Sequence, residues 1–234
     1  CKERAKELGY SFESMKAAVK KFARVFGEVC RGSPVDAIID LWWEGLLEWL
    51  MFRAECISLF VEEFIERIRE VGTGVEVGAA IFAPGLAFLV GQNYSRLGEL
   101  LDFAQPMIYH KCSGLACINF EVASLIREFL NCSKDTISYL LRFLGYNVDD
   151  VLSIEDLIEK GLSLSVAKLE VMRAKRLLRS DTRLCPIFYV NDINIGELEN
   201  IIRLAYELNI PEIALFQCSK VNISILRKAS RLYR

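Results

Sequence analysis

The sequence predicts an α/β protein in which strands alternate with helices. Three observations carry that prediction. Apolar runs of strand length recur between residues 75 and 109 and again between residues 184 and 216, helical apolar spacing fills the stretches between them, and polar side chains follow the ends of the runs. Runs that are apolar on both faces are typical of parallel strands covered by helices. The chain therefore reads as four successive β/α units in a single domain over residues 1–234.

The amino-terminal part is predicted to be helical. Gly9 ends a first short segment, and Ser11 is placed to cap a helix whose apolar face continues to about Val29. A long helical pattern follows over residues 35–71, with a bend expected near Gly45. Its three tryptophans recur at helical spacing, which is typical of a core, and a sugar-stacking platform is the alternative interpretation.

The first two strands are close together in the sequence. Residues 75–82 form a nearly all-apolar run that Pro84 and Gly85 end, and residues 103–109 form the next run. Ser95 is placed to cap a short helix between the two runs. This stretch is the expected centre of the fold.

A helical region without a strand pattern separates these strands from the next pair. It covers about residues 117–180, which is longer than a simple crossover. Ser133 and Ser153 are placed to cap helices within it, and the charges of its last helix, residues 164–179, predict a solvated face. We expect an insertion that covers the carboxyl ends of the strands.

The last part of the chain returns to a clean alternation of strand and helix. Strands are predicted over residues 184–190 and 211–216, and helices over residues 197–208 and 223–233. This alternation completes the four β/α units.

The composition excludes several classes of function. A net charge of −2 gives no general attraction to nucleic acid or to an anionic membrane, and no apolar stretch is long enough to cross a bilayer. The eight cysteines are scattered in apolar stretches, a pattern typical of free thiols in a reducing cytoplasm. Cys112 and Cys117 are the nearest pair, but their spacing is not that of a zinc site. Without a dinucleotide, phosphate-loop or nucleophile-elbow motif, we expect neither metal nor cofactor.

Hydrogen-bonding side chains gather where the predicted strands end, which is the ligand side of parallel α/β folds. Neutral donors beside aromatic rings suit a carbohydrate or another small polar ligand, and the glycine-poor loops after the last two strands disfavour a phosphate. Arg53, on the long helix, reaches this site or pairs with a neighbouring glutamate. The other candidate binding residues are Gln92, Asn93, Tyr94, Tyr109, Asn191 and Gln217.

Three short phrases carry a family resemblance: residues 90–94 (VGQNY), residues 102–109 with their Pro-Met-Ile-Tyr ending, and residues 213–216 (IALF). They resemble the later strands of glycoside-hydrolase-like (β/α)8 barrels of an uncharacterised prokaryotic type. In such barrels a cysteine-bearing segment like residues 1–10 follows the fourth strand. The resemblance implies that this chain holds the last four β/α units of a TIM barrel that binds or hydrolyses a carbohydrate.

Four parallel strands cannot close a barrel by themselves. Either the chain is the carboxyl-terminal half of a longer protein, or a second copy completes the barrel. We favour the first expectation, because the sequence has no initial methionine and opens in what the resemblance makes a mid-barrel connection.

Glycoside hydrolysis needs two carboxyl groups, and in the resembling barrels one follows the fourth strand, which this chain would lack. Asp192 directly follows a predicted strand and is the first candidate for the other, although a helix cap is the commoner role. Glu121 either reaches the site or lies on the surface. His110 is either structural or a binding or proton-transfer residue. The competing hypothesis is a degenerate, non-catalytic barrel that binds a sugar or a protein.

Overall fold

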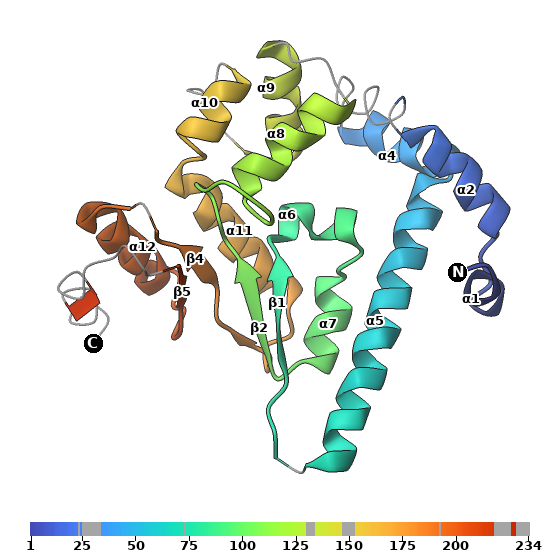
Figure 1. Ribbon diagram of the computed structural model, residues 1–234, viewed down its shortest axis with the longest axis horizontal. Coiled ribbons are helices and arrows are strands. Elements are labelled where there is room, and N and C mark those ends of the chain that lie inside the picture. Colours follow the sequence, from blue (N-terminus) through green and yellow to red (C-terminus); the bar gives the residue numbers. More distant parts are fainter. Residues whose placement is uncertain are drawn as a thin grey trace.

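The computed structural model describes residues 1–22, 24, 34–72, 74–129, 134–146, 153–191, 193–217 and 226–227. Within these ranges, helices lie around one parallel sheet, which confirms the predicted α/β class. In Figure 1 the strands lie at the centre of the molecule, between the long helix on the right and the carboxyl-terminal helix on the left.

The amino-terminal helices are α1 (Lys2–Glu7), α2 (Phe12–Lys20), α4 (Pro34–Trp43) and α5 (Leu46–Val71). Ser11 caps α2 as predicted, since its side chain accepts a hydrogen bond from the Ser14 N–H. This helix ends at Lys20, and Val29, its predicted end, lies outside the described residues. Gly45 has a φ of 74°, a left-handed conformation that separates α4 from α5 and confirms the predicted bend.

The expectation of a tryptophan core is wrong for α4. Trp42 and Trp43 lie in its last turn and are largely exposed, because no described element packs over that side of the helix. Trp49 of α5 is half-buried and packs edge-on against Phe22. The helical spacing therefore correctly predicted that the tryptophans lie on helices, but it did not predict which of their side chains are buried.

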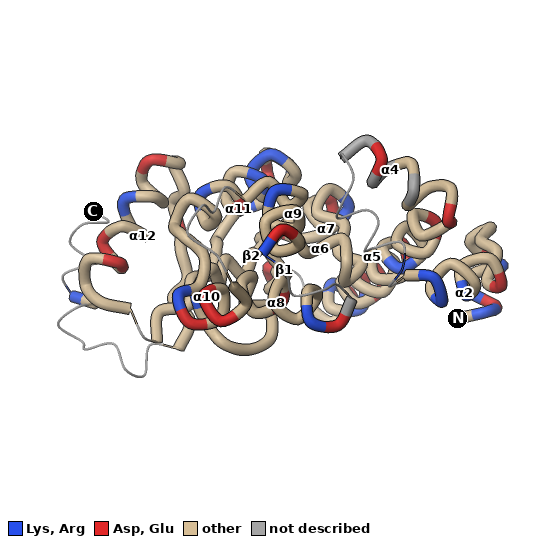
Figure 2. Tube along the Cα trace, turned by 90° about the horizontal axis from the view of Figure 1, so that it is seen from above, with Lys and Arg blue, Asp and Glu red and all other residues tan. Residues whose placement is uncertain are grey.

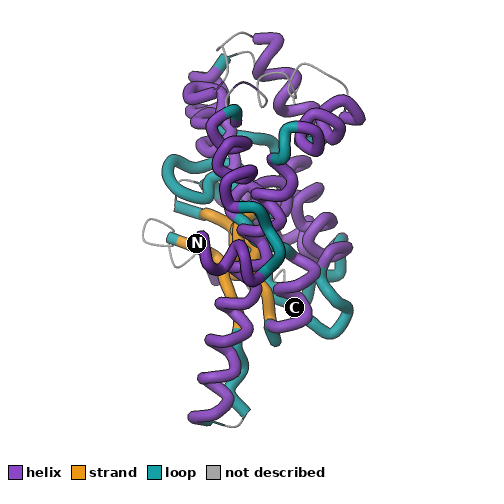
Figure 3. Tube along the Cα trace, turned by 90° about the vertical axis from the view of Figure 1, so that its right-hand side faces the viewer, coloured by secondary structure: helices purple, strands orange, loops and turns teal. Residues whose placement is uncertain are grey.

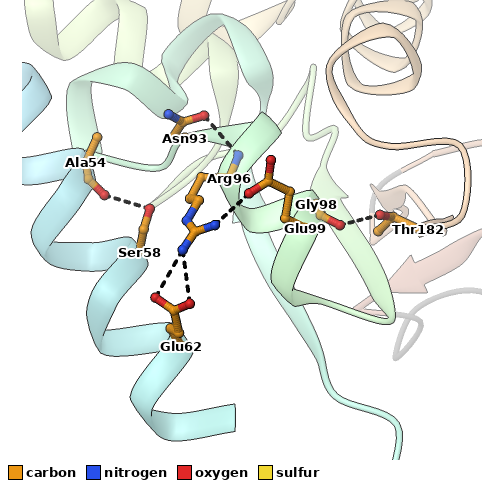
Figure 4. Close-up of polar contacts among 8 residues, drawn as sticks. All are labelled: Ala54, Ser58, Glu62, Asn93, Arg96, Gly98, Glu99 and Thr182. Atoms are coloured by element: carbon orange, nitrogen blue, oxygen red, sulfur yellow. Dashed lines mark hydrogen bonds and ion pairs between the residues drawn. The ribbon is translucent and has the colours of Figure 1, made fainter. Parts of the chain in front are cut away.

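The central segment contains β1 (Gly78–Phe82), α6 (Pro84–Ala87), the 3-10 helix η1 (Phe88–Val90), α7 (Tyr94–Leu100) and β2 (Phe103–Met107). Asn93, rather than Ser95, caps α7: its side chain accepts a hydrogen bond from the Arg96 N–H at 3.2 Å (Figure 4). Arg96 in turn donates to Glu62 of α5 and to Glu99, which ties α7 to α5.

The region predicted to be helical contains α8 (Ile118–Phe129), α9 (Lys134–Phe143), α10 (Ile154–Glu159) and α11 (Leu164–Leu177). In Figure 1, α8, α9 and α10 lie beyond the carboxyl ends of β1 and β2, while α11 runs back alongside the sheet. Ser153 caps α10 as predicted, by accepting from the Asp156 N–H. Ser133 lies outside the described residues.

The last segment contains β3 (Arg183–Leu184), β4 (Ile187–Tyr189), α12 (Ile195–Glu207) and β5 (Ala214–Phe216). The single strand predicted over residues 184–190 is interrupted at Pro186, which has no N–H to donate to a ladder. A reciprocal capping box between Asn194 and Glu197 starts α12 two residues before its predicted beginning. The helix predicted over residues 223–233 falls outside the described residues, except for 226 and 227.

All strand pairings in the described sheet are parallel: β1 pairs with β2, β2 with β3 and β4, and β4 with β5. The order β1-β2-β4-β5 follows the order of the chain, as it does in successive β/α units. The largest core cluster lies between this sheet and α8 to α12.

Among the described residues, helices cover one face of the sheet and leave most of the other without a helical cover. Ala104 and Phe188 point toward the helices and are fully buried, whereas Ala80 and Phe216 point the other way and are exposed. Figure 3 shows the helices mainly to one side of the strands. We call the other side the open face; its residues are Gly78, Ala80, Phe82, Phe103, Gln105, Met107, Arg183, Ile187, Tyr189, Ala214 and Phe216.

A buried polar cluster joins α6 to α11. Glu170 is fully buried, and its carboxylate accepts hydrogen bonds of 2.6 Å from the Gly85 N–H and from the Arg173 guanidinium. Arg173 also donates to the Leu144 carbonyl at 2.6 Å and lies over the Tyr146 ring. Two charged residues of α11, Glu170 and Arg173, therefore form a buried ion pair in addition to the charges on the predicted solvated face.

Charged side chains are spread over the outer helices. Figure 2 shows Lys and Arg interspersed with Asp and Glu, in keeping with a net charge of −2. Mixing of this kind produces no large field of one sign. Among the described helices, none combines the length and the apolar character that a bilayer crossing requires.

Candidate functional site

Three aromatic rings meet on the open face at the carboxyl ends of β2, β4 and β5. Tyr109 stacks on Phe216 with ring centroids 5.6 Å apart and planes only 10° from parallel. Tyr189 lies beside both rings, at 6.1 Å from Tyr109 and 6.4 Å from Phe216. We call these three side chains the aromatic platform. Tyr109 is buried, and Phe216 is 45% exposed, so the outer ring of the stack faces solvent.

Strand register brings the platform together. Tyr189 and Phe216 are paired residues of β4 and β5, so their side chains stand on the same face of the sheet. Tyr109 follows β2 by two residues and keeps the same side. The sequence analysis singled out Tyr109 but missed the other two. Both are the last residues of their strands, and only the register shows that they face the same side.

A disulfide closes the loop beside the platform. Cys112 and Cys117 are bonded to each other, which corrects the expectation of free thiols for this pair. Within the loop, Ala116 has a left-handed backbone, with a φ of 64°. Cys112 and Tyr189 line a small cavity of about 180 Å³ at this end of the sheet. Cys185 stays a buried free thiol, as predicted for such residues.

Two side chains from the start of α8 hold this disulfide loop. Asn119 is fully buried; it accepts from the Cys112 N–H at 3.2 Å and donates to the Cys112 carbonyl at 2.9 Å. Glu121, a predicted catalytic candidate, accepts from the Ala116 N–H at 2.9 Å. Its carboxylate therefore has a structural partner in the loop.

His110, another catalytic candidate, lies on the helix side of the sheet, away from the platform. It lines a cavity of about 250 Å³ together with Lys111 and Glu197, which form an ion pair at 3.2 Å. Burial, aided by the nearby charge of Lys111, lowers the pKa of His110 from 6.5 to about 4. The imidazole is therefore neutral at pH 7, and its proton affinity is too low for a base at that pH.

Burial of a neutral histidine predicts that stability falls in mild acid. The folded-state pKa of about 4 lies below the unfolded value of 6.5, so the unfolded chain binds more protons between these two values. The contribution is complete above pH 6.5 and is lost as the pH falls toward 4. Urea unfolding of wild type and His110→Gln across this range measures it cleanly, because the chain has one histidine. Equal slopes for the two proteins would contradict the assignment.

Gln92 and Tyr94, predicted to bind ligand, are engaged with the backbone of β1. The Gln92 side-chain oxygen accepts from the Phe82 N–H at 2.7 Å, and the Tyr94 hydroxyl donates to the Phe82 carbonyl at 2.6 Å. Tyr94 is buried, and burial raises the pKa of its hydroxyl. Together the two side chains satisfy the backbone N–H and carbonyl of Phe82, the last residue of β1. Asn93 between them caps α7.

Arg53 is held away from the platform. Its guanidinium donates to the Leu89 carbonyl at 2.6 Å and lies 4.8 Å from the centre of the Trp49 ring. Partial burial lowers the pKa of Arg53. The side chain therefore connects α5 to η1, and the structure supports neither the predicted site contact nor the alternative salt bridge to a neighbouring glutamate.

The remaining candidates follow the last two strands. Asn191 comes two residues after β4 and is half-buried, and Gln217 directly follows β5, is exposed and has a φ of 58°. Both therefore lie next in sequence to platform strands. Asp192 lies outside the described residues. No group of His, Cys, Asp or Glu within the described chain could hold a metal ion.

Fold and site together define an α/β protein with a parallel sheet of successive β/α units and an aromatic platform at the carboxyl ends of its strands. No family model, curated protein or solved structure matches the chain. The role of the site therefore has to follow from its own chemistry.

Proposed function

We propose that this chain is half of a glycoside-hydrolase-like (β/α)8 barrel and that its aromatic platform binds a carbohydrate. The observation that carries the proposal is the exposed ring of Phe216, which Tyr109 supports from behind and Tyr189 flanks. A ring held in this way presents one flat face at the end of the sheet where α/β barrels bind their ligands.

A sugar matches this surface in two respects. The C–H groups of a pyranose form an apolar face that buries surface against an aromatic ring, while its hydroxyl groups need neutral donors and acceptors. Asn191 and Gln217 supply amide groups after the two platform strands.

At the platform end of the open face, the last residues of β2, β4 and β5 are Met107, Tyr189 and Phe216, and none of them is charged. Arg183 lies at the amino end of the same face, where it pairs with Glu76. The uncharged platform end favours a neutral ligand over a phosphorylated one.

Hydrolysis makes a further demand, because it needs two carboxyl groups about 5–9.5 Å apart. Glu121 is bonded to the disulfide loop and His110 faces the other side of the sheet. We therefore propose Asp192 as the acid that this chain would contribute, with the second carboxyl group supplied by the rest of the barrel. The alternative role of a helix cap is taken by Asn194, which starts α12. If Asp192 takes no part in hydrolysis, the chain is the non-catalytic binding module of the competing hypothesis.

Cytoplasmic location and a lack of nucleic-acid and membrane partners stay part of the proposal. The free thiols of Cys1, Cys56 and Cys185 support a reducing compartment. The Cys112–Cys117 bond is the feature that argues for an oxidising one. Thiol labelling of the protein from its source would distinguish the two compartments.

Affinity electrophoresis in gels containing xylan, mannan, β-glucan or starch tests carbohydrate binding. We expect retardation of the wild type in at least one gel, and an affinity about 2- to 10-fold weaker for Phe216→Ala, because the stacking face is lost. Tyr206→Ala is the matched control, since Tyr206 is a 75% exposed aromatic residue of α12, outside the platform. No retardation of the wild type, or equal retardation of both variants, overturns the proposal.

Release of reducing sugar from the retained polysaccharide tests hydrolysis in the same experiment. Asp192→Asn should abolish release and leave retardation unchanged if Asp192 is catalytic. Retardation without release by the wild type would identify a non-catalytic binding module.

A further inference from the structure

The Cys112–Cys117 disulfide is a weak structural cross-link. Its cysteines are five residues apart, and a bond that closes so short a loop constrains the unfolded chain less than one that closes a long loop. The loop also has other ties, because Asn119 binds both backbone groups of Cys112 and the Ile118 N–H donates to the Tyr109 carbonyl at 2.8 Å. The bond is therefore not the main constraint on the loop.

Free thiols accompany this disulfide. Among the described residues, Cys1 is exposed, Cys56 is half-buried and Cys185 is buried, and each is a free thiol. Structural disulfides are rare in compartments that keep thiols reduced, and the disulfides found there are usually catalytic or redox-sensing. One short-loop disulfide in a chain with free thiols is therefore the combination expected of a redox-active pair.

The two bonded cysteines differ in access. Cys112 is half-buried and lines the cavity of about 180 Å³ beside Tyr189, whereas Cys117 is only 3% exposed. The cavity is several times larger than the roughly 30 Å³ that one water occupies, so it has room for a small thiol. Lys111 and Glu159 line it with opposite charges, so neither neutral nor anionic thiols are repelled. An incoming thiol therefore meets Cys112 first.

Cys117 has the position of a leaving group. It directly precedes α8, and its carbonyl accepts a backbone hydrogen bond from the Glu121 N–H at 2.8 Å, as the residue before a helix does. The first N–H groups of a helix have no carbonyl partner within it, and their partial positive charge stabilises a thiolate at this position. The opposing charge is the Glu121 carboxylate, which is hydrogen-bonded to the Ala116 N–H. A stabilised thiolate leaves faster in thiol–disulfide exchange.

We infer that Cys112–Cys117 is a redox-active disulfide that exchanges with low-molecular-weight thiols at Cys112. A thiolate attacks the Cys112 sulfur and forms a mixed disulfide, while the electron pair of the broken bond leaves on the Cys117 sulfur, which takes up a proton. A second thiol attacks the sulfur of the bound small molecule and releases Cys112 as a thiolate, which is protonated in turn. The pair gains two electrons and two protons, and two small thiols are oxidised to one disulfide.

The loop favours the reverse reaction as well. A separation of five residues keeps the two reduced thiols within reach of each other. The hydrogen bonds between Asn119 and the Cys112 backbone involve no sulfur atom, so they persist in the dithiol, although they are weaker there. Exchange at this pair does not involve a sugar, so this inference and the proposed function fail independently.

Alkylation of the native full chain, followed by digestion and mass spectrometry, tests the exchange. We expect N-ethylmaleimide to label Cys112 only after treatment with dithiothreitol, with unchanged circular dichroism, and glutathione disulfide to restore the bond. Cys185 is the internal control, because a buried free thiol stays unlabelled while the fold stays closed. Labelling of Cys112 without reductant, only in denaturant, or only together with Cys185 would overturn the inference.

Two single variants test which sulfur is attacked. Cys117→Ser leaves the Cys112 thiol beside the cavity, and Cys112→Ser leaves the buried Cys117 thiol. We expect glutathione disulfide to form a mixed disulfide with Cys112 about 10-fold faster than with Cys117. Equal rates, or a faster reaction of Cys117, would contradict attack at Cys112. The wild-type labelling remains decisive if either variant fails to fold.

Discussion

Replacing Glu170 by alanine should lower the free energy of unfolding by about 3–5 kcal/mol. The carboxylate is fully buried and accepts from both the Gly85 N–H and Arg173. Its removal leaves the amide and one arm of the guanidinium without an acceptor, in a place where water does not replace it. Urea unfolding followed by circular dichroism measures the loss.

Glu207→Ala is the matched control for this substitution. Glu207 also pairs with a cation of α11, Lys168, at 3.0 Å, but both side chains are exposed. Loss of such a pair should cost less than about 1 kcal/mol. Glu170→Gln should lie between the two alanine variants, since its amide oxygen still accepts from one donor. A Glu170→Ala loss no larger than the control loss would show that the buried cluster contributes little.

The sheet was predictable because its strands are apolar runs bounded by helix breakers. The predicted runs over residues 75–82 and 103–109 contain β1 and β2, which are shorter, and the strand order along the sheet follows the chain. The cover of the sheet was not predictable. An apolar run indicates that both faces need burial, but it does not say which polypeptide supplies the second cover.

The site was harder to predict for two reasons. Strand register decides which side chains meet, and nearby backbone groups can bind the side chains that a ligand would need. Gln92 and Tyr94 have the chemistry of ligand-binding residues. Their side chains instead form hydrogen bonds with the N–H and carbonyl of Phe82 at the outer edge of β1. Asn93 and Ser95 are both good caps, and Asn93 starts the helix early enough to place Tyr94 in the core. Tyr189 and Phe216 become a platform only when β4 and β5 pair in register.

Replacing Asn119 by alanine should lower the free energy of unfolding by about 2–3 kcal/mol. Its buried amide serves three backbone groups: the N–H and carbonyl of Cys112, and the Leu157 carbonyl at 3.1 Å. Alanine leaves all three without this partner and frees the disulfide loop from the end of α10. Asn200→Ala, at an exposed position of α12, is the control and should change stability by less than about 0.5 kcal/mol.

The disulfide and Asn119 hold the same residue, so their effects should not add. In a Cys112→Ser, Cys117→Ser background the loop has already lost its covalent closure and makes weaker hydrogen bonds to Asn119. We therefore expect Asn119→Ala to cost less in that background than in the wild type, by at least about 0.5 kcal/mol. Urea unfolding of the four proteins closes the cycle. Strictly additive losses would mean that Asn119 holds Cys112 in place with or without the disulfide, and that the bond contributes nothing to the geometry beside the platform.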